Sequence, residues 1–102
     1  MVPTILNNVV KNELILIGKL KFLKRTYPSL IKSFRGKGLL YCIEFKDEEI
    51  ANKIALSLIK NNVYIFSRGQ FLFISPPLII TKNELEETLE KLRISLFSYF
   101  LT

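Results

Sequence analysis

Apolar residues recur along this chain with two different periods, and the order in which the periods alternate restricts the fold more than any other feature. Over residues 4–26, 47–61 and 81–100 the apolar side chains return every three or four positions, as on the buried face of a helix. Four short runs between these stretches are rich in β-branched and aromatic residues, which favour strands. The sequence therefore predicts three helices and four strands.

The first helix is predicted over residues 4–26. It ends at Tyr27 and Pro28, because the residue before a proline is disfavoured in the helical region. Its expected buried stripe consists of Ile5, Leu6, Val9, Val10, Leu14, Ile17, Leu20 and Leu23.

Capping residues predict where the other two helices begin. Asp47 is suited to cap the second helix, whose first turn carries Glu48 and Glu49 at the positive end of the helix dipole. Thr81 and Glu84 have the spacing of a capping box, which starts the third helix. The expected buried stripes consist of Ile50, Ala51, Ile54, Ala55, Leu58 and Ile59, and of Leu85, Leu89, Leu92, Leu96, Tyr99 and Phe100.

The first pair of strands is predicted over residues 30–34 and 39–45. The turn between them, residues 35–38, contains Gly36 and Gly38. Glycine suits positions that need a positive φ or a close backbone approach, so this arrangement indicates a hairpin.

The second pair of strands is predicted over residues 63–66 and 71–74, joined by the glycine-containing loop 67–70. Pro76 and Pro77 end the last strand, because proline has no N–H group to donate in the middle of a sheet.

The resulting order, α-β-β-α-β-β-α with short connections, predicts an α+β fold. We expect a two-layer sandwich in which helices cover one face of a small, mostly antiparallel sheet, and we expect residues 1–102 to form a single domain. Hydrophobic residues make up 49% of the chain, which is enough to cover a core. Phe71 and Phe73 share one face of their strand, and we expect both in the core, because so small a sheet needs its apolar side chains inside.

The composition excludes several kinds of active site. The chain has no histidine and one cysteine, so it can form neither a Ser-His-Asp triad nor a His/Cys zinc site. Cys42 lies in an apolar run, and we expect a buried thiol rather than a nucleophile. The acidic run 47–49 matches the dipole of the following helix, and no metal site is expected. A single thiol, no signal peptide and no membrane-spanning run together predict a cytoplasmic location.

Positive charge is concentrated in the first 40 residues, which hold eight lysines and arginines and one acidic residue, Glu13. A concentration of positive charge like this is typical of a nucleic-acid binder and equally of a solvated helix face. The segment 35–38 is not a phosphate-binding P-loop, since a strand and not a helix follows it. From the residues alone, a freestanding basic RNA-binding module therefore remains open, and so does a small regulatory domain of ferredoxin-like build.

Three segments resemble class III pyridoxal-phosphate aminotransferases in the right order and spacing. Residues 35–40 (RGKGLL), followed by 43–45 (IEF), are similar to the RGKGL…G-[IL]-E strand of that family. Residues 74–81 (ISPPLIIT), leading into 83–85 (NEL), resemble its PPL-x-I-T-x-x-E-[IL] strand-to-helix junction. Between them, residues 49–63 are similar to the family's helix-to-strand step.

The resemblance implies the C-terminal small domain of a fold-type I aminotransferase, the lid that closes on a larger domain. In that family the Schiff-base lysine and the cofactor-binding residues belong to the large domain. The resemblance thus implies that the intact parent uses pyridoxal phosphate, transfers an amino group between an amine or amino acid and a 2-oxo or keto acceptor, and is a homodimer. This chain would be an inactive fragment or a split subunit whose partner is the large domain. Neither nucleic acid nor a membrane is an expected partner.

The resemblance also assigns individual residues. Arg35, Gly36, Gly38, Pro76 and Pro77 match the structural motif, and no residue matches a catalytic, cofactor-binding or metal-binding position.

Three of this chain's residues depart from the family pattern. Phe73 stands where many members have an arginine directed at a substrate carboxylate. Phe66 matches the position of an earlier arginine found in one branch, and Arg68, two positions on, is the candidate substitute as substrate-binding residue. Cys42 replaces the glycine of G-[IL]-E. The identity of the substrate therefore stays open.

Overall fold

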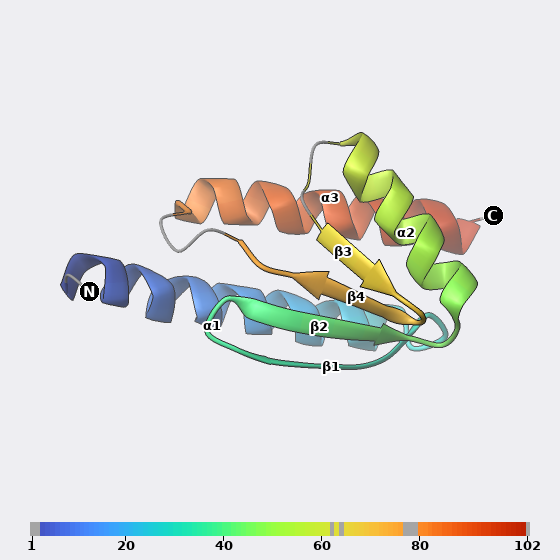
Figure 1. The fold of residues 1–102 in the computed structure, drawn as a ribbon, viewed down its shortest axis with the longest axis horizontal. Helices are drawn as coiled ribbons and strands as arrows, with labels where there is room; N and C mark the ends of the chain where they lie inside the picture. The colour runs from blue at the N-terminus through green and yellow to red at the C-terminus, as the bar shows by residue number, and fades with distance from the viewer. Residues whose placement is uncertain (1–2, 62, 64, 77–79, 102) are drawn as a thin grey trace.

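The computed structural model describes residues 3–61, 63, 65–76 and 80–101, with side chains from residue 7 onward. The expected stripe positions Ile5 and Leu6 and the motif residue Pro77 therefore lie outside the described side chains. The predicted order of elements is confirmed (Figure 1). The elements are α1 (Pro3–Thr26), β1 (Ile31–Lys37), β2 (Leu40–Phe45), α2 (Glu48–Lys60), β3 (Ile65–Arg68), β4 (Phe71–Ile74) and α3 (Lys82–Leu101).

The four strands form one sheet in the order β1-β2-β4-β3, and every neighbouring pair is antiparallel. Both predicted hairpins are confirmed, β1 with β2 and β3 with β4. The helices lie on one side of the sheet (Figure 1), where they cover the alternate strand positions Tyr41, Ile43, Phe45, Leu72 and Ile74. The α+β sandwich with helices on one face is thus the fold of this chain.

The strand boundaries differ from the prediction. β1 continues through Lys37, so the turn of the first hairpin falls on Gly38 and Leu39. Gly38 has a φ of 63°, which glycine adopts without strain. Gly36 lies within the strand, where a Cβ would be 2.6 Å from Tyr41 Cγ, so the close approach expected at this glycine is confirmed.

The second hairpin is displaced in the same direction. β3 ends at Arg68, so the turn consists of Gly69 and Gln70, with Gly69 at a φ of 59°. Arg68 is therefore a strand residue and not a loop residue.

Both predicted caps are confirmed. The Asp47 carboxylate accepts a hydrogen bond from the Ile50 N–H at 2.9 Å. Thr81 and Glu84 form the reciprocal capping box, since the Thr81 N–H donates to the Glu84 carboxylate at 3.0 Å and the Glu84 N–H donates to the Thr81 hydroxyl at 3.1 Å. The sequence therefore fixes the starts of α2 and α3 through local hydrogen bonds.

The predicted buried stripes need correction. In α1, Leu16 is fully buried with Leu20 and Leu23, whereas Val10 and Leu14 are 51% and 68% exposed. Leu20 and Leu23 of the predicted stripe are thus confirmed as buried. Because α1 carries apolar residues on several sides, periodicity alone did not distinguish the exposed Val10 and Leu14 from the buried Leu16. Exposed residues elsewhere in the predicted stripes are Ile59 of α2 and Phe100 of α3.

Candidate functional site

The residues singled out by the sequence gather on the face of the sheet that the helices leave uncovered. We call this surface the open sheet face; it is formed by Lys32, Ser33, Arg35, Lys37, Leu40, Cys42, Glu44, Phe66, Arg68, Phe71 and Phe73. Its residues lie in cross-strand rows, of which one runs Arg35, Cys42, Phe73, Phe66 and the next runs Ser33, Glu44, Phe71, Arg68.

The expectation that Phe71 and Phe73 pack in the core is wrong. Both side chains are half-buried on the open sheet face, and Leu72 and Ile74 fill the core positions of the same strand. Successive side chains of a strand point to opposite faces. Because β4 is apolar at every position, its sequence did not tell which pair would face the helices.

Aromatic and cationic groups lie next to one another on the open sheet face. The rings of Phe66 and Phe73 have centroids 5.6 Å apart, and Phe66 is 61% exposed. The Arg35 guanidinium lies 6.0 Å from the centre of the Phe71 ring, a cation–π distance. Arg68 is paired directly with Phe71 across β3 and β4. Phe71 therefore has two arginines as neighbours, Arg35 through the ring contact and Arg68 through strand pairing.

The one carboxylate of the open sheet face, Glu44, is held by neighbouring donors. One oxygen accepts from the Ser33 hydroxyl at 3.1 Å, and the other accepts from the Gln70 amide at 2.6 Å and lies 3.7 Å from Lys32 Nζ. Within the described part of the chain, neither Arg35 nor Arg68 forms an ion pair. The two guanidinium groups are therefore available to an anion.

Cys42 is half-buried on the open sheet face, so the expected core position is wrong. Burial raises the pKa of its thiol, the Arg35 charge lowers it, and the Glu44 charge raises it, with a net increase. A raised pKa keeps the sulfur protonated at neutral pH, which is unlike an activated nucleophile.

Glu13 of α1 anchors the turn of the first hairpin. Its carboxylate accepts from the Gly38 N–H at 2.8 Å and from the Tyr41 hydroxyl at 3.1 Å. Burial, followed by this contact with the carboxylate, raises the pKa of the Tyr41 hydroxyl. No local sequence pattern predicts this contact, because the partners are 25 and 28 residues apart.

The motif residues from the resemblance and the substrate-binding candidate Arg68 divide into two groups. Gly36 and Gly38 shape the hairpin next to Tyr41, and Pro76 follows Ile74, the residue paired with Tyr41. Arg35 and Arg68 instead point outward on the open sheet face and flank Phe71 there. The structure thus separates residues that shape the hairpin from residues that a ligand or partner can reach.

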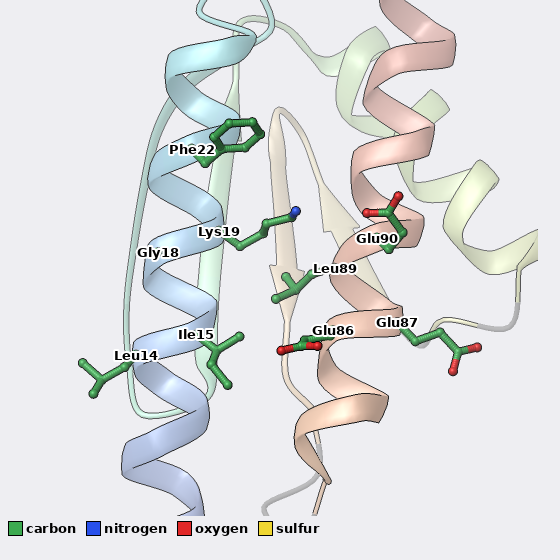
Figure 2. Close-up of a pocket in the computed structure, with 9 residues that line it drawn as sticks. All are labelled: Leu14, Ile15, Gly18, Lys19, Phe22, Glu86, Glu87, Leu89 and Glu90. Atoms are coloured by element: carbon green, nitrogen blue, oxygen red, sulfur yellow. The ribbon is translucent and has the colours of Figure 1, made fainter.

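A groove of about 650 Å³ lies between α1 and α3, on the helix side of the molecule (Figure 2). Lys19 extends into it near Phe22, whose ring centre is 5.5 Å from the ammonium group. The α3 side of the groove is acidic. The lining residues are Leu14, Ile15, Gly18, Lys19, Phe22, Glu86, Glu87, Leu89 and Glu90.

Among residues 3–61, 63, 65–76 and 80–101, no three His, Cys, Asp or Glu side chains come together as a metal site. In the same ranges, none of the helices combines the length and the apolar content needed to cross a membrane.

Comparison with known proteins matches residues 2–96 to the family described as Aminotransferase class-III. Three solved structures superpose on the chain with a TM-score of 0.85 each. Acetylornithine aminotransferase from Elizabethkingia anophelis is 23% identical, over 93% of this chain and 26% of its own. Lysine aminotransferase from M. tuberculosis in the internal aldimine form is 18% identical, over 93% and 22%. The PMP-bound form of an aminotransferase from Vibrio fluvialis is 22% identical, over 99% and 24%.

These identities are low, and the structural likeness by itself shows a shared fold. The chain spans between 22% and 26% of the length of the three solved proteins. The match to the family is a match of sequence, and it covers residues 2–96, nearly the whole of this chain. By that match, the chain belongs to the class III aminotransferase family.

Proposed function

We propose that this chain is the C-terminal lid domain of a class III aminotransferase. The intact protein would transfer an amino group between an amine or amino acid and a 2-oxo or keto acceptor. One observation carries the proposal: residues 2–96 match the family, yet the chain spans only about a quarter of the solved aminotransferases. The match therefore accounts for one part of such an enzyme.

Class III aminotransferases depend in general on pyridoxal phosphate, which supplies an electron sink for the reaction. The groove between α1 and α3 does not fit that cofactor. Lys19 is the lysine of the groove between α1 and α3, but Glu86, Glu87 and Glu90 line the same groove and would repel a phosphate. We therefore propose that the chain alone binds no cofactor and has no transaminase activity.

The open sheet face is the surface on which we propose that the larger, lysine-bearing part docks. Leu40 and Phe66 are 59% and 61% exposed there, and Phe71 and Phe73 are half-buried. Exposed apolar patches of this kind are typical of interaction surfaces, in which aromatic residues and arginine are enriched. The larger part would be supplied by a separate chain or by a longer form of the protein, and the whole would form a homodimer in the cytoplasm.

Arg68 is the residue that we propose for substrate binding. Its guanidinium can hold a carboxylate through two parallel hydrogen bonds. Its exposed position on the open sheet face, next to Phe71, supports the assignment. Phe73 offers no such bond to a carboxylate from the position that carries an arginine in many relatives.

Reconstitution tests this function. The chain would be produced together with a class III segment that carries the Schiff-base lysine, first of all one encoded beside its own gene. We expect the two to co-purify and the pair to transfer amino groups from alanine to a panel of keto acids, whereas neither does so alone. Failure to co-purify with every such segment from the same genome would contradict the proposal.

The same assay tests Arg68. Arg68→Gln should raise KM for carboxylate substrates in the pair that still co-purifies, because the fork that holds the carboxylate is lost. Arg25→Gln, on the exposed end of α1, is the matched control and should change neither property. An unchanged KM in Arg68→Gln would remove this residue from the substrate site.

A further inference from the structure

We propose that the open sheet face of the free chain binds single-stranded RNA. This inference goes beyond the aminotransferase role and does not depend on it. Phe71 and Phe73, which were expected in the core, lie instead on the open sheet face, where a base can reach their rings.

The first argument is the aromatic platform. Phe71 and Phe73 lie two positions apart on β4, a central strand of the four-stranded sheet, and Phe66 extends the platform to β3 through its contact with Phe73. Residues at this spacing point to the same side about 7 Å apart, so each ring can accept one base. Stacking of unpaired bases on aromatics of an open sheet is a common mode of RNA recognition, and it tolerates any base.

The second argument is charge. The two edge strands of the open sheet face carry four cations, Lys32, Arg35 and Lys37 on β1 and Arg68 on β3, against the single carboxylate of Glu44. Lys32 is the one cation close to that carboxylate, which leaves three for phosphates. Cations on both sides of an aromatic platform match a strand whose bases stack while its phosphates run along the edges.

The third argument favours RNA over DNA. Glu44 lies beside Phe71 in the register, and its carboxylate retains lone pairs beyond those used by Ser33 and Gln70. A ribose 2′-hydroxyl can donate to this acceptor, and a deoxyribose cannot. In DNA the same carboxylate would only repel the phosphates.

The larger part of an aminotransferase and an RNA strand would compete for one surface. The inference therefore concerns the chain while this face is free. It also places the contact on the sheet and not on the basic outer side of α1, where Lys21 and Lys24 lie.

The test uses fluorescence anisotropy of the full chain with fluorescein-labelled ten-nucleotide oligouridylate and oligoadenylate, and with oligothymidylate as the DNA arm. At about 50 mM salt we expect an RNA Kd tighter than about 10 µM, and weaker binding of the DNA. Three phosphate contacts predict a slope of log K against log salt of about −2.

Variants separate stacking from plain charge attraction. Phe71→Ala and Phe73→Ala should each weaken RNA binding about tenfold, and Phe73→Tyr should restore it, because the ring carries the contact. Phe66→Ala, at the most exposed of the three rings, repeats the test with the least risk to folding. Phe22→Ala on α1 is the matched control and should bind as the unchanged chain does.

Three outcomes would overturn the inference. The first is no saturable RNA binding by the folded chain. The second is equal loss of affinity in Phe22→Ala or in Lys21→Gln and Lys24→Gln, which would place the contact on α1. The third is unchanged affinity in the three phenylalanine variants together with full competition by heparin. That result would reveal a cationic surface that binds any polyanion by charge, without stacking. None of these results bears on reconstitution of the aminotransferase, so the two proposals fail separately.

Discussion

Replacing Gly36 by alanine tests how the first hairpin is packed. Gly36 is paired with Tyr41, and an added Cβ would lie 2.6 Å from Tyr41 Cγ, 2.7 Å from Tyr41 Cα, and closer still to the Leu40 carbonyl oxygen. Two of these three atoms belong to the backbone, so a side-chain rotation cannot relieve the overlap. Either the two strands separate or Tyr41, which is 4% exposed, is pushed out of the core.

The size of the effect follows from these contacts. Overpacking a well-filled site costs about 1–3 kcal/mol. Displacing Tyr41 also breaks its hydrogen bond with Glu13, which adds about 1 kcal/mol. We therefore expect Gly36→Ala to lower the free energy of unfolding by about 2–4 kcal/mol, which for a chain of this size lowers Tm by about 10–25 °C.

Urea and thermal unfolding followed by circular dichroism would measure the change, with Gly18→Ala as control. Gly18 lies in the middle of α1, where a Cβ would meet nothing within 4 Å. The same substitution there should stabilise the chain by about 1 kcal/mol, because alanine is the better helix former. The reasoning is refuted if Gly36→Ala costs less than about 0.5 kcal/mol, the range of an unconstrained surface position.

Three further predictions concern single sites. Asp47→Ala should lower the free energy of unfolding by about 1 kcal/mol in urea titrations, because the Ile50 N–H loses its hydrogen-bond acceptor. An unchanged midpoint of urea unfolding would show that water replaces the Asp47 carboxylate. The hydrogen bond from the Thr81 N–H lowers the pKa of the Glu84 carboxyl in the folded chain. The stability that this hydrogen bond contributes is therefore complete above the pKa of Glu84 in the unfolded chain, and it is lost as the pH falls through the lowered pKa of the folded chain. Carbon-13 NMR should give this lowered pKa, and an ordinary value would contradict the capping box. Pyridoxal phosphate and borohydride should not label one lysine of the isolated chain stoichiometrically. Such a product, found by peptide mass spectrometry, would refute the proposal that the chain alone binds no cofactor.

The parts of the fold that could be predicted from the sequence depend on local chemistry. The hydrogen bonds of Asp47 and of Thr81 with Glu84 join residues three positions apart, so their spacing was enough. Gly38 and Gly69 have the positive φ values that turns require, and both hairpins were predicted correctly.

The parts that could not be predicted depend on which of two apolar faces is covered. β4 is apolar on both sides, and only the packing of α2 and α3 puts Leu72 and Ile74 inside and leaves Phe71 and Phe73 outside. The candidate site was misjudged for the same reason, because the open sheet face consists of the residues that packing left over. Long-range contacts such as Glu13 with Tyr41 have no local pattern at all.

The strand order has a consequence for how the chain folds. Each hairpin is closed by a short turn and can form within about 1–10 µs. The pairing of β2 with β4, which brings Tyr41 opposite Ile74, must instead close a loop that contains the whole of α2. Such closure carries an entropy cost that the hairpins avoid. During synthesis β4 leaves the ribosome after the other strands, so β3 stays separate from the first hairpin until Ile74 has emerged. Premature release of the nascent chain would leave the first hairpin without its neighbour β4.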